Sequence, residues 1–65
     1  MRNPNRIHEI CELLEKVWNY VPDWRLGQLV VNLARHANSY DPFFLEDDKM
    51  KQALEEYLAE AEENG

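Results

Sequence analysis

Apolar residues recur at helical spacing in three stretches of this chain. The first set is Ile7, Ile10, Cys11, Leu14, Val17 and Trp18. The second is Leu26, Leu29, Val30, Leu33 and Ala37, and the third is Met50, Ala53, Leu54, Tyr57, Leu58 and Ala61. Spacings of three and four residues place each set on one face of an α-helix. The pattern therefore predicts amphipathic helices over about residues 4–20, 24–37 and 47–62.

Turn and capping residues fix the expected helix boundaries. Asn3 is expected to cap the first helix, with Pro4 at its first position, where the missing N–H costs nothing. Pro22 ends this helix because the residue before a proline is disfavoured in helical geometry. Asp23 then offers a side-chain acceptor to the free N–H groups that open the second helix.

The second predicted helix has an almost wholly apolar face, and we expect it to be the central helix of the fold. Gly27 lies in its first turn and costs about 1 kcal/mol relative to Ala. Close packing of the first helix against Gly27 would compensate for this cost. We therefore expect the two helices to approach each other at this residue.

Turn residues dominate the start of segment 38–46, and Phe43, Phe44 and Leu45 follow. We interpret the segment as an aromatic loop that folds down over one end of the core. Three helices with short connections predict an all-α fold, a small three-helix bundle in a single domain over residues 1–65.

The amino-acid composition predicts a small folded domain that does not span a membrane. The chain is 45% hydrophobic, so it is expected to fold despite a net charge of −6. A domain of this size hides only about 60% of its unfolded surface, so its stability depends on good packing or on a partner. No apolar run approaches the length that spans a membrane. Cys11 is the one cysteine, which predicts a buried thiol and a reducing, cytoplasmic environment.

A family resemblance rests on segment 6–14 and on these further positions: Trp18, Pro22, Asp23, Leu26, Gln28, Leu29, Asn32 and Leu33. These positions resemble the YihD-like family, small bacterial proteins of unknown function. A related pattern in bacterial and phage genomes reads Pro-Asp-x-Arg-Leu-Gly-Gln-Leu, followed by Asp-Pro-Phe and an acidic run, and it matches segments 22–29 and 41–48. The resemblance implies a compact bacterial or phage cytoplasmic protein and carries over no catalytic residue.

The sequence offers little for catalysis or metal binding. His8 lies three residues before Cys11 and four before Glu12, but structural zinc needs four ligands, usually including paired Cys or His. Ser39 is the single Ser, no Thr is present, and Cys11 lies on the core stripe, so a nucleophile is not expected. We therefore expect no enzyme activity, no metal, no cofactor and no small-molecule substrate.

The polar side of the second helix carries Arg25, Gln28, Asn32 and Arg35, a set that recognition helices use on base edges. Affinity for nucleic acid comes mainly from neutralised phosphates, and this chain has a pI near 4.7 with no basic cluster. We therefore expect no direct nucleic-acid binding, and interpret this side as a solvated helix face or a contact for a protein.

Aromatic residues exceed what a three-helix core requires, and aromatic and Arg side chains dominate the centres of protein interfaces. The hypothetical protein-binding surface comprises Trp24, Arg25, Gln28, Val31, Asn32 and Phe43. The alternative is that the aromatic residues only cap a thin core.

Charge is divided unevenly along the chain. Residues 1–37 hold five basic and four acidic side chains, whereas residues 38–65 hold two basic and nine acidic ones. Exposed carboxylates such as Glu55, Glu56 and Glu60 could imitate the phosphates of nucleic acid, or could only keep the protein soluble. The sequence thus predicts a non-enzymatic protein-binding or regulatory module that binds another protein or forms a homodimer. The alternative is an acidic inhibitor that occupies a nucleic-acid-binding site on another protein.

Overall fold

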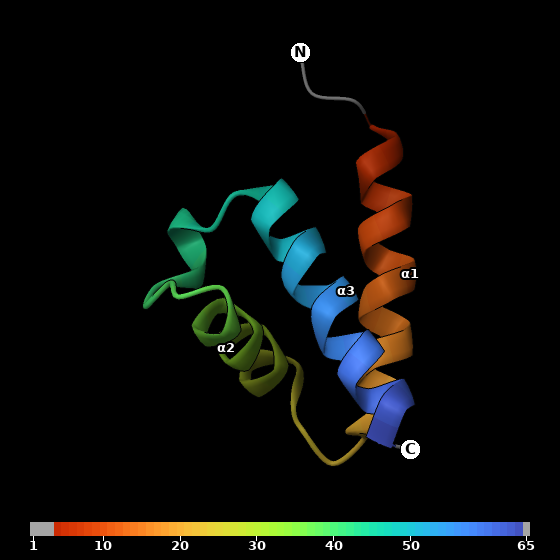
Figure 1. Cartoon of the computed structure of the whole chain (residues 1–65). Helices are drawn as coiled ribbons and strands as arrows, with labels where there is room; N and C mark the ends of the chain where they lie inside the picture. Colours follow the sequence, from red (N-terminus) through yellow and green to blue (C-terminus); the bar gives the residue numbers. More distant parts are fainter. Residues whose placement is uncertain (1–3, 65) are drawn as a thin grey trace.

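Three α-helices and one 3₁₀ turn make up the computed structural model, which describes residues 4–64 (Figure 1). The elements are α1 (Asn5–Tyr20), α2 (Leu26–His36), η1 (Pro42–Phe44) and α3 (Asp47–Asn64). No strand occurs among the described residues. The predicted all-α, three-helix architecture is therefore confirmed. No helix in the described part of the chain is both long and apolar enough to cross a membrane.

The central helix is α3, not α2 as the sequence had predicted. α3 packs along α1 and also contacts α2. Figure 1 shows α1 and α3 side by side and running in the same direction, while α2 is viewed nearly end-on beside α3. The physical reason is the breadth of the apolar band on α3. Ala53 and Leu54 at its centre are fully buried, and Tyr57 and Leu58 extend the band towards the two neighbouring helices.

One small apolar cluster holds the helices together. Its buried members are Val17 from α1, Leu29 and Leu33 from α2, and Ala53 and Leu54 from α3. Half-buried apolar residues surround this cluster: Ile10, Leu13, Leu14, Trp18, Val21, Trp24, Ala37, Met50, Tyr57 and Leu58. Much of the apolar surface is thus only partly covered, as expected for a domain of this length.

Two ion pairs tie the first turns of α1 and α3 together. Arg6 Nε donates to Asp47 Oδ2 at 2.7 Å, and Lys51 Nζ donates to Glu9 Oε2 at 2.8 Å. Both pairs are partly exposed, so each contributes modestly to stability. Both pairs join the N-terminal parts of the two helices, which is consistent with their parallel alignment.

The start of α1 differs slightly from the prediction. Pro4 stands at the N-cap and not at the first helical position, and helix geometry begins at Asn5. The predicted cap, Asn3, lies outside the described residues. The end of α1 at Tyr20, ahead of Pro22, is as predicted.

α2 begins at Leu26, two residues later than predicted, with Arg25 and not Asp23 as its N-cap. The backbone N–H of Arg25 donates to Gln28 Oε1 at 2.8 Å. This bond is one half of a capping box, in which the side chain at the third helical position accepts from the backbone N–H of the cap residue. The other half needs an acceptor on the side chain of the cap residue, and the Arg25 guanidinium has none. Trp24 lies outside the helix, and its carbonyl accepts a hydrogen bond from Trp18 Nε1.

Gly27 does not bring α1 and α2 together. A Cβ placed on this residue would meet no atom within 4 Å, and the residue is exposed. The predicted close approach is therefore wrong, because Gly27 lies on a flank of α2 that no other element covers. At the other end of the chain, α3 continues to Asn64, beyond the predicted limit near residue 62.

Candidate protein-binding surface

The end of α2 directs the chain into a short, well-defined turn. Asn38 adopts the left-handed conformation with a φ of 62°. Its N–H donates to the Arg35 carbonyl at 2.9 Å, and the Ser39 N–H donates to the Ala34 carbonyl at 2.8 Å. These two bonds form a Schellman motif, in which Asn is one of the few residues that accept positive φ. The helix therefore ends in a fixed geometry.

Asp41 organises the 3₁₀ turn that follows. Its Oδ1 accepts from the Phe43 N–H at 3.0 Å, and its carbonyl accepts from the Phe44 N–H at 3.1 Å and from Ser39 Oγ at 3.1 Å. Pro42 occupies the first position of η1, where no N–H is needed. The backbone of this turn is thus held by local hydrogen bonds.

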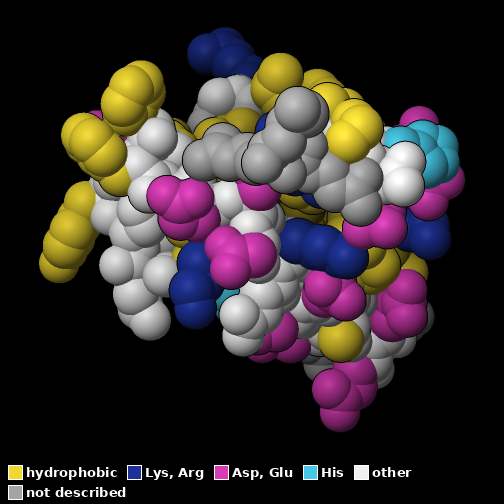
Figure 2. Space-filling view, turned by 90° about the horizontal axis from the view of Figure 1, so that it is seen from above, with side chains coloured by type: hydrophobic (Ala, Val, Ile, Leu, Met, Phe, Trp, Pro, Cys, Tyr) yellow, Lys and Arg dark blue, Asp and Glu magenta, His cyan; other side chains and the backbone are white. Residues whose placement is uncertain are grey.

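The aromatic side chains of this turn point into solvent. The exposed fractions of Tyr40, Phe43 and Phe44 are 102%, 84% and 73%. The rings of Phe43 and Phe44 lie edge to face, with centroids 5.0 Å apart. Figure 2 shows hydrophobic side chains projecting at its left edge, the side on which η1 lies in Figure 1. We call residues 40–44 the aromatic turn.

The prediction that Phe43 and Phe44 fold down over the core is therefore wrong. In a 3₁₀ helix, residues three apart share a side. Pro42 and Leu45 are three apart, and both are half-buried, so they take the inward side. Phe43 and Phe44 are consequently directed outward.

The six residues of the predicted binding surface do not form one patch around Trp24. The Trp24 ring is half-buried and lies edge-on to Tyr57 of α3, with centroids 6.1 Å apart. The backbone carbonyl of Trp24 also accepts the hydrogen bond from Trp18 Nε1. Trp24 therefore supports the fold, whereas Phe43 lies in the aromatic turn.

The remaining members of that predicted surface lie on α2 or at its cap. Arg25 and Gln28 are exposed at its start, and the Gln28 side chain is engaged in the cap. Val31 is 36% exposed and Asn32 is half-buried. The sequence had not singled out Tyr40 and Phe44 as companions of Phe43. The Pro42–Leu45 spacing could have identified Phe44, because it leaves the two residues between them on the outer side. Tyr40 lies before this turn, and the spacing gives no signal for it.

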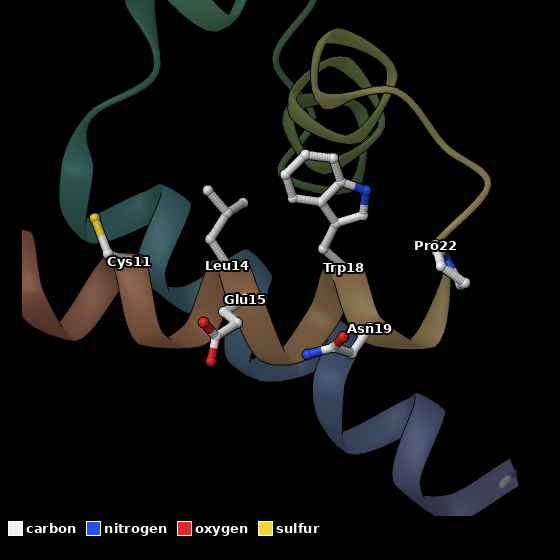
Figure 3. A pocket seen from close by; sticks show the side chains of 6 residues that line it. All are labelled: Cys11, Leu14, Glu15, Trp18, Asn19 and Pro22. Carbon is white, nitrogen blue, oxygen red and sulfur yellow. The ribbon is translucent and has the colours of Figure 1, made fainter.

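An open groove runs along α1, with a volume of about 500 Å³, and we call it the α1 groove (Figure 3). Its lining consists of Cys11, Leu14, Glu15, Trp18, Asn19 and Pro22. Figure 3 shows Cys11, Leu14 and Trp18 projecting from one side of α1, with the Trp18 ring directed towards α2. Glu15 and Asn19 lie along the flank.

Cys11 is exposed in this groove, so the predicted burial of its thiol is wrong. The apolar stripe of α1 is wider than the surface that α3 covers. Val17 is fully buried in the core, whereas Cys11 and Ile7 remain exposed at the edge of the stripe.

The acidic residues singled out on α3 are all exposed, namely Glu55, Glu56 and Glu60. Glu56 Oε2 lies 3.9 Å from His36 Nε2, and the His36 ring lies edge-on to Tyr57. On α1, His8 Nε2 lies 2.9 Å from Glu12 Oε1, as their spacing predicts. Within residues 4–64, no group of three or more His, Cys, Asp or Glu side chains is arranged to hold a metal ion.

Comparison with known proteins identifies no match to this chain. No protein-family model matches the chain, and neither the curated proteins nor the solved structures contain a match. The resemblance to the YihD-like family accordingly stays a prediction.

Proposed function

We propose that this chain is a small, non-enzymatic, cytoplasmic protein-binding module whose binding element is the aromatic turn. The observation that carries the proposal is the exposure of Tyr40, Phe43 and Phe44 at one fixed turn. Soluble monomers rarely leave large apolar patches uncovered unless the patch is used for binding. Rings of this kind are typical anchors at the centres of protein interfaces.

Local hydrogen bonding makes the aromatic turn suited to binding. The bonds from Phe43 and Phe44 to Asp41 hold the backbone before a partner arrives. A preorganised turn loses less conformational entropy on association than a flexible loop does. The contact between the two rings further restricts their orientation.

The test is a tagged pull-down from a nuclease-treated bacterial lysate, washed at low salt and at about 0.5 M salt. The test variant combines Phe43→Ser with Phe44→Ser. Leu26→Ser is the matched control, because it removes another exposed apolar side chain outside the turn. We expect the wild type and the control to retain a partner through the salt wash and the double variant to lose it. Capture of the same proteins by all three chains would contradict the proposal.

A second candidate function is mimicry of nucleic acid by α3, and it is supported by the exposure of Glu55, Glu56 and Glu60. Such a protein would occupy the basic groove of a nucleic-acid-binding protein. The test is the triple variant with Gln at these positions in the same pull-down. Loss of a basic partner both in about 0.5 M salt, where exposed charges are screened, and with the triple variant would favour mimicry. Retention in both cases would exclude it.

A further inference from the structure

We infer that the C-terminal end of α2 binds a carboxylate of the partner protein, so that the partner presents an acidic segment beside the aromatic turn. The inference rests on the proposed role of the aromatic turn and adds the chemistry of the partner. The site is the pocket that Arg35, Asn38, Ser39 and Tyr40 line, and we call it the α2 pocket. Its volume is about 280 Å³.

Hydrogen-bond donors surround the α2 pocket. The Arg35 guanidinium presents its N–H groups in a planar fork that fits a carboxylate, and the Asn38 amide adds further donors. The Ser39 hydroxyl already donates to the Asp41 carbonyl at 3.1 Å. Arg35 and Asn38 are exposed, and Tyr40 is fully so. An anion can therefore reach the guanidinium, the amide and the Tyr40 hydroxyl from solvent.

Arg35 forms no ion pair within residues 4–64, although the chain holds 13 acidic side chains. The basic members of the ion pairs in this range are Arg6, His8, His36 and Lys51. An Arg side chain satisfies its charge best against a carboxylate or a phosphate. The Arg35 guanidinium is thus open to an acid from outside the chain.

Other pockets that basic side chains line in the described part of the chain differ in this respect. Lys16 shares its pocket with Glu62, and Lys49 shares its pocket with Glu56. No acidic residue lines the α2 pocket. An incoming carboxylate therefore meets a like charge in those two pockets and an unopposed guanidinium at Arg35.

The local charge at the α2 pocket is opposite to the net charge of the chain, which is −6. Residues 24–40 contain two arginines and no acidic residue. Two acids lie near this segment and are engaged within the chain: the Asp41 carboxylate accepts a backbone N–H of η1, and Glu56 pairs with His36. Exposed charges more than about 10 Å away are largely screened at 0.1 M salt. Arg35 therefore provides a positive site on an acidic protein.

The α2 pocket is continuous with the aromatic turn. Tyr40 belongs to both, and η1 packs beside the end of α2 (Figure 1). The Schellman motif at Asn38 and the hydrogen bonds of Asp41 hold the two surfaces in a fixed relation. A partner segment that covers the Phe43 ring can thus place an acidic side chain on Arg35. Aromatic and Arg side chains together are typical of the centres of protein interfaces.

An acidic peptide segment suits this site better than a nucleic acid does. Affinity for nucleic acid requires several Lys or Arg side chains on successive phosphates. Residues 24–40 supply two arginines, and acidic side chains outnumber basic ones by 13 to 7 in the whole chain. A peptide segment needs one guanidinium for its carboxylate and an apolar contact for a neighbouring side chain. The α2 pocket and the aromatic turn supply these two contacts.

Titration of the ¹⁵N-labelled chain, followed by NMR in about 0.1 M salt, tests the inference. The probe is a short synthetic peptide of Glu, Ser and Leu residues, and two counterparts carry Gln or Lys in place of every Glu. A single-stranded oligonucleotide is the fourth probe. The test variant is Arg35→Gln, and Lys16→Gln on α1 is the matched control, because it removes the same charge at another exposed helical position. Gln is a good helix former, and circular dichroism checks that both variants fold.

We expect the Glu peptide to shift the signals of Arg35 Nε and of the Asn38, Ser39 and Tyr40 amides, and the Gln peptide to bind far more weakly. The affinity for the Glu peptide should fall about tenfold with Arg35→Gln, as for loss of a hydrogen bond to a charged group, and stay unchanged with Lys16→Gln. Absence of binding, equal binding of the Gln peptide, or equal affinity of Arg35→Gln would overturn the inference. Tighter binding of the Lys peptide or of the oligonucleotide would overturn it as well.

The pull-down with the turn variant judges the proposed function separately. A partner that is lost with Phe43→Ser and Phe44→Ser but kept by Arg35→Gln would support the function and contradict the acidic segment. A partner lost with both variants and kept by Lys16→Gln would support the function and the inference together.

Discussion

The indole Nε1 of Trp18 donates a hydrogen bond of 2.8 Å to the backbone carbonyl of Trp24. This bond joins α1 to the connection that leads into α2, which starts at Leu26. It also holds the Trp18 ring, which lines the α1 groove. The connection between α1 and α2 and the α1 groove therefore depend on the same residue.

Replacing Trp18 by Phe should destabilise the protein by about 0.5–1.5 kcal/mol through loss of this bond, beyond the effect of the smaller ring. Trp24→Phe is the matched control, because it keeps the accepting carbonyl and an aromatic ring near Tyr57. Urea unfolding measures both variants. Equal free energies of unfolding for Trp18→Phe and the wild type would show that the bond contributes nothing.

Gly27→Ala should stabilise the protein by about 0.5–1 kcal/mol, because Ala restricts the unfolded chain and favours the helix. The added methyl group meets no atom within 4 Å. In a domain of this size, that gain corresponds to a rise of several degrees in Tm. Thermal unfolding followed by circular dichroism measures the change. A lower Tm would mean that another part of the chain requires Gly at this position.

Asn38→Ala should destabilise the protein by about 1–2 kcal/mol, because Ala adopts the left-handed conformation less readily than Asn does. The φ of Asn38 is 62°. Asn38→Gly should be close to neutral, since Gly adopts positive φ readily. Chemical unfolding of the two variants gives the comparison. Equal losses from Ala and Gly would assign the effect to the Asn side chain and not to its backbone.

Local patterns in the sequence were sufficient to predict the helices. The spacing of apolar residues located all three, and Pro22 marked the end of α1. The cap of α2 was predicted at Asp23 although Gln28, three residues after Arg25, is a local signal for a cap at Arg25, since its side chain accepts from the Arg25 N–H. Helical spacing alone also cannot say how much of a stripe a neighbouring helix covers.

The candidate site was predicted in part. Phe43 was assigned to the predicted binding surface and is exposed in the structure, but its exposure follows from a 3₁₀ turn that helix and strand periodicities do not describe. The assignment of Trp24 to a surface failed for another reason. Its partner Tyr57 lies 33 positions further along the chain, so only the tertiary fold brings the two rings together.

The pair Glu9–Lys51 should make stability fall at both extremes of pH. The hydrogen bond from Lys51, followed by its positive charge, lowers the pKa of Glu9 below 4.5. The hydrogen bond to Glu9, followed by its negative charge, raises the pKa of Lys51 above 10.5. The Glu9 contribution is present above pH 4.5 and is lost as pH falls through its lowered pKa. The Lys51 contribution is present below pH 10.5 and is lost as pH rises through its raised pKa.

Unfolding of Lys51→Met across the pH range measures this contribution. The variant should differ from the wild type between these limits and approach it at either extreme. The difference should be small and reduced by salt, since both groups are partly exposed. A difference that is the same at every pH would assign the effect to the lost methylene packing of Lys51 and not to the ion pair.

The double variant Phe43→Ser with Phe44→Ser should leave the free energy of unfolding nearly unchanged, within about 0.5 kcal/mol per substitution. Both rings are largely exposed and contact each other more than the core. Leu54→Ala provides the contrast, because Leu54 is fully buried and its truncation should cost about 2–5 kcal/mol. Urea unfolding is measured at two protein concentrations, since self-association would add stability that depends on concentration. A large loss in the double variant would assign the two rings to folding, and a negligible loss would show that they are not needed for it.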